Sequence, residues 1–148
     1  MTDTPRTLLH YPERLAVVRL GPGSEVPAWA ESSSVFSVTA TATETSVVCA
    51  ARDVPGKARK AAPYTAFVVQ GTLDPSEVGV LHALLGPLVE AEVPVMALST
   101  FDTDWVLVPT DRADDAAEAW RRRGHTIEPA APVAAPEPAP GRPRKKKR

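Results

Sequence analysis

Residues 71–108 constrain the fold more than any other part of the chain, because they combine a helix start, an apolar helical stripe and two short strands. Asp74 and Pro75 are typical of the cap and the first position of a helix, and Glu77 stands where a capping box needs an acidic residue. Apolar residues then recur at the spacing of one helix face, at Val78, Leu81, Leu84, Leu85 and Leu88. This pattern predicts a loop, an amphipathic helix and two strands joined by a tight turn.

The order of elements from Tyr64 onward indicates the fold class. Strands are predicted at residues 64–70, 93–98, 105–108 and 125–128, and helices are predicted to begin at Asp74 and Asp111. The order β-α-β-β-α-β is that of ferredoxin-like folds. We therefore expect an α+β domain over residues 64–128, with an antiparallel sheet and helices on one face.

The preceding part of the chain repeats this pattern in a shorter form. Strands are predicted at residues 15–20, 35–40 and 46–50, with a single helical turn at residues 27–31. The expected domains are a flexible N-terminus over residues 1–12, a shortened half over residues 13–63, and a disordered Pro/Ala-rich tail over residues 129–148. Within the shortened half, residues 52–63 are expected to be a linker.

Charge is distributed unevenly between the body and the tail. All 18 acidic residues precede Arg142, whereas the last seven residues are almost all basic. A net charge of −1 therefore conceals an acidic body and a cationic end. Such an end suits a solubilising role, or weak and non-specific contact with nucleic acid or another anionic surface.

The sequence offers little that would support catalysis or a metal site. The three histidines and Cys49 lack metal-ligand spacing, no nucleotide-binding glycine loop occurs, and no nucleophile has a nearby base in a recognisable motif. We therefore expect no cofactor and no enzymatic activity, with Cys49 in the core. One cysteine, no signal peptide and no membrane-length apolar run favour a cytoplasmic protein without membrane contact.

Several segments resemble the ACT-domain family, and within it the ACT-like (CASTOR-type) amino-acid sensors. These segments are residues 36–39, 44–49, 71–74, 78–81 and, most specifically, 99–108. The resemblance implies an ACT fold, a free amino acid bound between ACT units, and a signal passed to a partner or an attached enzyme. Sensors with known ligands often have four ACT units and this chain has at most two, so a complete site either needs a dimer or does not exist. Carried over residue by residue, the resemblance points to Asp74, Glu77, Val78, Gly79, Thr100, Phe101 and Asp104.

The candidate site joins the predicted helix start to the turn between the two strands. No lysine or arginine occurs from Ala61 to Asp111, whereas seven carboxylates do, which favours a ligand with a positively charged group. First-turn helix amides can donate to a ligand carboxylate, although the charges of Asp74 and Glu77 would repel it. The candidate ligand-binding residues are Asp74, Ser76, Glu77, Val78, Gly79, Ser99, Thr100, Phe101, Asp102 and Asp104. The alternative is a plain capped helix beside a solvated acidic rim.

The sequence therefore predicts a regulatory or sensor module that binds a free amino acid or a similar small, polar, cationic ligand. Its expected protein partner is a second copy of itself or a regulated protein. Two alternatives stay open. One is a ligand-free ACT-like dimerisation module, because an unpaired sheet edge invites pairing. The other is a protein that its basic tail tethers to nucleic acid.

Overall fold

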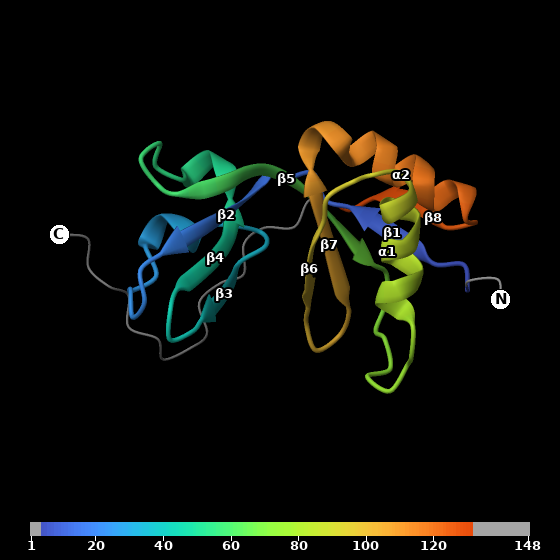
Figure 1. Cartoon of the computed structure of the whole chain (residues 1–148), viewed down its shortest axis with the longest axis horizontal. Helices are drawn as coiled ribbons and strands as arrows, with labels where there is room; N and C mark the ends of the chain where they lie inside the picture. Colours follow the sequence, from blue (N-terminus) through green and yellow to red (C-terminus); the bar gives the residue numbers. More distant parts are fainter. Residues whose placement is uncertain (1–3, 132–148) are drawn as a thin grey trace.

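The computed structural model describes residues 4–131, so the basic end of the tail lies outside the described residues. The described chain forms eight strands, two α-helices and three 3-10 turns (Figure 1). The strands are β1 (Thr7–His10), β2 (Leu15–Leu20), β3 (Ser37–Ala40), β4 (Thr45–Ala50), β5 (Lys60–Val69), β6 (Met96–Ser99), β7 (Asp104–Pro109) and β8 (Thr126–Pro129). The helices are α1 (Val80–Glu90) and α2 (Ala113–Arg122), and the 3-10 turns are η1 (Ala28–Ala30), η2 (Ala51–Asp53) and η3 (Thr110–Arg112).

The long strand β5 connects two parts of one sheet. Its first half pairs antiparallel with β2, and its second half pairs antiparallel with β1 on one side and β7 on the other. The pairs β2–β4, β3–β4 and β6–β7 are also antiparallel, whereas β1 and β8 are parallel. Each half of β5 therefore belongs to a different part of the sheet, as Figure 1 shows.

Each part of the sheet, with its connections, is a ferredoxin-like unit. In the second unit the C-terminal half of β5, α1, β6, β7, α2 and β8 follow in the predicted order. In the first unit β2, η1, β3, β4, η2 and the N-terminal half of β5 repeat that order, with each helix reduced to one 3-10 turn. The predicted α+β fold with a shortened ACT-like half is thus confirmed. The expected linker over residues 52–63 is wrong in part, because β5 begins at Lys60 and closes the first unit.

Strand β1 corrects the prediction of a flexible entry over residues 1–12. It lies between β5 and β8, and Leu8 is buried in the main core. A four-residue strand is too short to show alternation in the sequence, and both of its neighbours are distant along the chain. At the other end, β8 runs to Pro129 and the Ala130 amide donates to the His10 carbonyl at 2.8 Å, so any tail begins later than residue 129.

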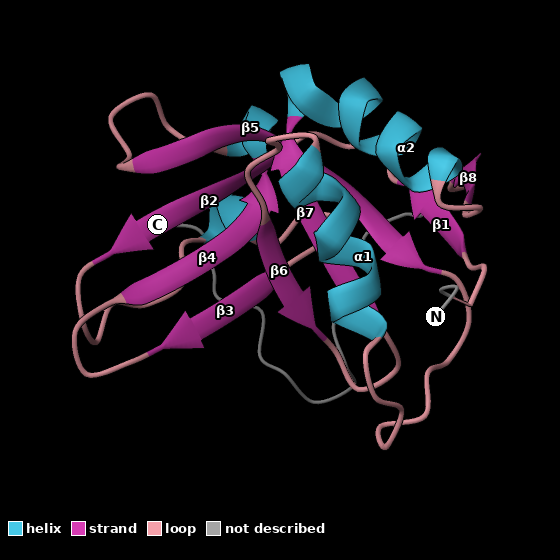
Figure 2. Cartoon of the chain, turned by 45° about the vertical axis from the view of Figure 1, so that its right-hand side comes forward, coloured by secondary structure: helices cyan, strands magenta, loops and turns pink. Residues whose placement is uncertain are grey.

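Both α-helices pack on the same face of the second unit, as Figure 2 shows. Leu84 of α1 and Trp120 of α2 are fully buried in one cluster with Phe67 of β5. The Trp120 Nε1 donates to the Leu84 carbonyl at 2.8 Å, and the Trp120 ring meets Phe67 edge to face at 4.9 Å. Side chains alternate across a strand, so the residues next to Phe67 face the other way. There the first unit covers the sheet, through a cluster of Leu15, Val35, Ala66 and Leu107.

Candidate functional site

The loop after β5 and the turn between β6 and β7 lie against each other, as the sequence predicts. The Leu73 amide donates to the Asp102 carbonyl at 2.7 Å, which joins the two segments through their backbones. Between these segments and the start of α1 is a hollow of about 390 Å³, which we call the helix-start hollow. The predicted site residues that line it are Asp74, Glu77, Gly79, Ser99, Thr100, Phe101, Asp102 and Asp104.

Two of the predicted site residues lie away from the helix-start hollow. The Ser76 side chain bonds back to Asp74, and Val78 is 95% exposed to solvent. Ser76 and Val78 take these positions because residues 74–79 form a loop, and not the first turns of a helix. The remaining predicted residues lie together around the hollow, and their role in binding a ligand stays a prediction.

Local hydrogen bonds fix the turn between β6 and β7. The Ser99 hydroxyl donates to Asp104 Oδ1 at 2.6 Å, and the Thr100 amide donates to the Thr103 carbonyl at 2.8 Å. Thr103 also lines the hollow, and its hydroxyl donates to the Val69 carbonyl at the end of β5, at 2.8 Å. Sequence patterns do not single out Thr103, because this contact joins residues far apart in the chain. The turn therefore holds Asp104 in a defined place beside the loop.

Helix α1 begins at Val80, and not at Asp74 as predicted. Asp74 instead forms a local turn, in which its Oδ1 accepts from the Ser76 hydroxyl at 2.7 Å and from the Ser76 amide at 2.8 Å. These two bonds, the hydroxyl first, hold the pKa of Asp74 below its ordinary value. Gly79 precedes the helix with a φ of 89°, a left-handed conformation that glycine adopts without strain. The Asp74 carboxylate therefore accepts hydrogen bonds as a capping residue does, but it stabilises the turn that precedes α1 and not the helix itself.

The first-turn amides of α1 have no side-chain cap. No side chain caps the helix, and no acidic residue occupies its first turn. The first amide bonded along the helix is that of Ala83, which donates to the Gly79 carbonyl at 3.0 Å. The amides of Val80, Leu81 and His82 therefore have no partner within the helix. Together with the helix dipole, they favour an anionic group at this end of the hollow.

An arginine from outside the predicted segment neutralises the hollow in part. Arg6, just before β1, forms an ion pair with Glu77, and its side chain is only 16% exposed. Its backbone is held by β8, since the Arg6 amide donates to His125 Nδ1 at 3.1 Å and its carbonyl accepts from the Thr126 amide at 2.9 Å. The sequence correctly shows no cation from Ala61 to Asp111, but β1 brings one from the N-terminus. Among the residues that the structure describes, the lining of the hollow itself contains no lysine or arginine, and Arg6 compensates the Glu77 charge from beside it.

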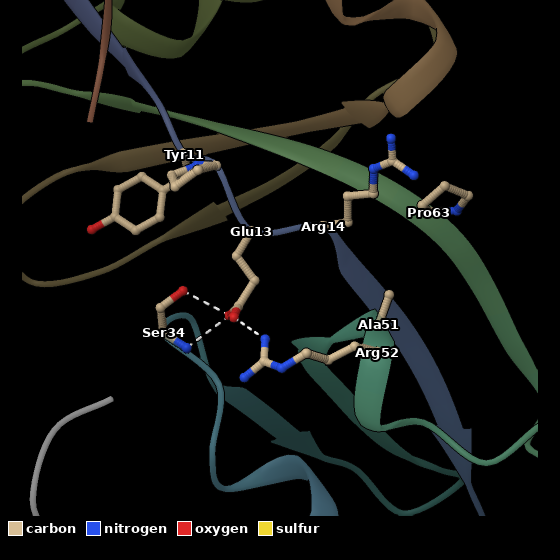
Figure 3. Close-up of a pocket in the computed structure, with 8 residues that line it drawn as sticks. Tyr11, Glu13, Arg14, Ser34, Ala51, Arg52 and Pro63 are labelled. Carbon is tan, nitrogen blue, oxygen red and sulfur yellow. Dashed lines mark hydrogen bonds and ion pairs between the residues drawn. The ribbon is translucent and has the colours of Figure 1, made fainter. Parts of the chain in front are cut away.

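A second and larger hollow, of about 640 Å³, was not predicted from the sequence. We call it the junction hollow, because it lies where the chain passes from β1 into β2, beside the shared strand β5 (Figure 3). Its lining side chains are those of Tyr11, Pro12, Glu13, Arg14, Ser34, Ala51, Arg52 and Pro63. They come from four segments that are separate along the chain, so spacing in the sequence carries no sign of them.

The Glu13 carboxylate holds one wall of the junction hollow together. Its Oε1 accepts from the Ser34 amide at 2.8 Å and from the Ser34 hydroxyl at 2.7 Å, and its Oε2 pairs with Arg52. Burial acts to raise the pKa of Glu13, but the bonds from Ser34 and the Arg52 guanidinium outweigh it, so the pKa lies below its ordinary value. Glu13 is therefore ionised at neutral pH.

Cys49 lies in the core, as predicted. Burial, followed by the charges of Asp53 and Glu13, raises the pKa of its thiol to about 11, so the thiol is protonated at neutral pH. Among residues 4–131, no group of His, Cys, Asp and Glu side chains is arranged to hold a metal ion. Neither α1 nor α2 is long and apolar enough to span a membrane.

Comparison with protein families finds a match in each unit. A model of the ACT domain matches residues 61–122, which include most of the second unit and the helix-start hollow. A second model, which describes an N-terminal domain, matches residues 13–57 of the first unit. None of the curated proteins matches the chain.

Solved structures share the arrangement of both units. A protein of Agobacterium tumefaciens is 26% identical with a TM-score of 0.81, over 87% of this chain and 96% of that chain. The regulatory subunit of aspartate kinase from Thermus flavus is 10% identical with a TM-score of 0.59, over 82% and 99% of the two chains. A Vibrio cholerae protein of unknown function, named as a possible transport protein, is 14% identical with a TM-score of 0.59, over 78% and 89%. The last two likenesses show the fold alone.

Replacing Glu13 tests the ion pair in the junction hollow. Glu13→Gln keeps an acceptor for Ser34 and loses the charge that pairs with Arg52, so we expect a lower urea midpoint at pH 7. A carboxyl whose pKa is lower in the folded state stabilises the protein above its unfolded pKa of about 4.3, and loses this contribution as the pH falls through the folded value. The difference in urea midpoint between wild type and variant, measured by tryptophan fluorescence, should therefore become smaller from pH 7 to pH 3.

Glu31→Gln is the matched control, because Glu31 is an exposed glutamate of the same unit. Its urea midpoint should follow that of the wild type at both pH values. A difference in urea midpoint between wild type and Glu13→Gln that stays constant down to pH 3 would contradict the lowered pKa of Glu13.

Proposed function

Because residues 61–122 of this chain match the ACT domain, we propose that the chain is a regulatory module that binds a free amino acid in the helix-start hollow and catalyses no reaction of its own. ACT domains are typically small-molecule-binding regulatory modules. The observation that carries the proposal is the hollow itself, which has carboxylates on one side and unpartnered helix amides on the other.

The two ends of the hollow suit the two charges of an amino acid. Asp102 and Asp104, in and beside the β6–β7 turn, would receive the ammonium group, and the amides of Val80 and Leu81 would donate to the carboxylate. A micromolar Kd corresponds to about 8.2 kcal/mol, or roughly 0.8 kcal/mol per atom for a ligand of about ten heavy atoms. That is below the ceiling of about 1.5 kcal/mol per atom for very small ligands, so the binding free energy that the proposal requires is within the usual range.

The repulsion that the sequence predicts between Glu77 and a ligand carboxylate is relieved by Arg6. Glu77 lines the hollow near the helix start, but Arg6 compensates its charge. Asp74 lies farther from the helix than predicted, because α1 begins at Val80 and Asp74 is bonded to Ser76. The helix amides therefore stand as the dominant electrostatic feature at that end of the hollow.

The ammonium contact is tested by Asp104→Asn in a thermal-shift panel of the twenty amino acids. Asparagine keeps the acceptor for Ser99 and removes the charge, so the unliganded variant should melt with the wild type. We expect at least one amino acid to stabilise the wild type, by about 2.7 kcal/mol at 100-fold excess over Kd, and to lose this effect in the variant. Asp111→Asn, an exposed aspartate outside the hollow, should behave as wild type. If no amino acid raises the midpoint of the wild type, the proposal fails.

The electrostatic role of Arg6 is tested by a double-mutant cycle with Glu77. Arg6→Gln uncovers the Glu77 charge beside the helix amides and should weaken binding of the amino acid by about fivefold, measured by calorimetry. The double variant Arg6→Gln/Glu77→Gln removes both charges and should recover the wild-type Kd. Equal weakening by Arg6→Gln in the presence and absence of Glu77 would mean that Arg6 contacts the ligand directly, against this account.

The free edges of the sheet favour a second candidate function, that of a dimerisation module that needs no ligand. In the described residues β3 and β6 each pair with a single neighbour, and neither strand contains a charged residue. Val38 of β3 and Met96 of β6 are 39% and 37% exposed, with Phe36 and Val95 exposed beside them. Uncharged, exposed edges invite pairing with another chain.

Light scattering after size exclusion separates the two candidates. In the dimerisation module, Met96→Lys should turn a dimer into a monomer, because it places a charge in the pairing edge. Val89→Lys, on a 74% exposed site of α1, is the control and should leave the dimer intact. A dimeric mass of the wild-type protein that added amino acids do not change supports the dimerisation module. A monomeric mass of the wild-type protein rules it out.

A further inference from the structure

The junction hollow is built by parts of the chain that the proposed function does not use. Tyr11 to Arg14 connect β1 to β2, Ser34 precedes β3, Ala51 and Arg52 belong to η2, and Pro63 lies in β5. The hollow therefore lies at the point where β5 passes from the first unit to the second. At about 640 Å³ it is within the usual size range of small-molecule sites.

The two charged groups on one wall of the junction hollow, Glu13 and Arg52, form an ion pair with each other. Glu13 accepts from Ser34 and pairs with Arg52, as the dashed lines in Figure 3 show. Arg52 is shared with a second carboxylate, since its Nε lies 3.6 Å from Asp53 Oδ2, and its Nη2 donates to the Ser32 carbonyl at 3.4 Å. Both charges of this pair are engaged within the protein, and together they form a polar wall.

Arg14 is the lining cation that no described carboxylate compensates. Its carbonyl accepts from the Ala51 amide at 2.9 Å, which fixes the backbone, but within residues 4–131 its guanidinium forms no hydrogen bond or ion pair. Figure 3 shows this guanidinium directed away from the Glu13 carboxylate, on the side of Pro63. The planar guanidinium of Arg14 matches the geometry of a carboxylate.

The rest of the lining is largely apolar. Pro12, Pro63 and Ala51 offer no side-chain hydrogen-bonding groups. The Tyr11 ring is fixed by an edge-to-face contact with Trp105 at 4.8 Å, so one wall of the hollow is aromatic and rigid. A ligand for this hollow thus needs an apolar body beside its charged group.

We propose that the junction hollow binds a small organic monocarboxylate, whose carboxylate pairs with Arg14 and whose apolar body lies against Tyr11, Ala51 and Pro63. A cation is disfavoured, because Arg14 lines the hollow and the oxygens of Glu13 already have partners. Phosphate is disfavoured, because it has no apolar body to lie against Tyr11, Ala51 and Pro63, and its second charge would find no further unpaired cation in the described lining. The site is separate from the helix-start hollow in residues and in ligand charge.

The test uses benzoate as the probe, titrated into the ¹⁵N-labelled full chain and followed by amide chemical shifts. We expect saturable shifts at Arg14, Ser34, Ala51 and Arg52, and much smaller shifts with neutral benzamide or with inorganic phosphate. Arg14→Gln should weaken benzoate binding by about tenfold, the scale of a lost charge-assisted pair. Arg59→Gln removes an equal charge from an exposed arginine outside the hollow and should leave the Kd unchanged.

Several outcomes would overturn the proposal. Benzoate shifts that are absent, or that centre on residues 73–80 and 99–104, would mean that the junction hollow does not take the carboxylate. Equal weakening by Arg14→Gln and Arg59→Gln would mean that benzoate follows general positive charge. Phosphate binding as strong as that of benzoate would remove the preference for a monocarboxylate. Unliganded melting points of both variants, matched to the wild type, ensure that a loss of binding is not a loss of fold.

Discussion

The pairing of β5 with three other strands is the constraint on which the rest of the structure depends. Its N-terminal half completes the sheet of the first unit, and its C-terminal half is the central strand of the second. Thr65 to Val69 are buried without a break, since α1 and α2 cover one face and the first unit covers the other. Neither unit can therefore be removed without exposing apolar surface of the other.

Much of this architecture is readable from local patterns. Strand β2 and the single turn at η1 follow from short apolar runs and glycine or proline punctuation, and the order of elements in the second unit follows from periodicity. The meeting of the loop after β5 with the β6–β7 turn also follows, because topology puts both at the same end of the sheet. These features depend on residues that are close in sequence or on the order of whole elements.

Most of the features that the sequence did not predict depend on contacts between distant residues. Strand β1 is defined by neighbours more than fifty residues away, as in the pairing of Leu8 with Val69. The start of α1 was misplaced because Asp74 satisfies its capping chemistry with Ser76, while the left-handed Gly79 begins the helix later. Arg6 reaches Glu77 only because β1 is in the sheet. These errors therefore follow from one missing strand and from one local turn that competes with the helix.

Both hollows use the same electrostatic arrangement, and the segment around β1 supplies part of each. In one, Arg6 compensates Glu77 and leaves the α1 amides as the anion-favouring group; in the other, Arg52 compensates Glu13 and leaves Arg14. Arg6 lies at the start of β1, and Glu13 and Arg14 follow its end. Because β1 is hydrogen-bonded to β5 and β8 along its length, its two ends are held at a fixed separation. Strand β1, which the sequence does not predict, therefore links the segment that supplies Arg6 to the segment that supplies Glu13 and Arg14.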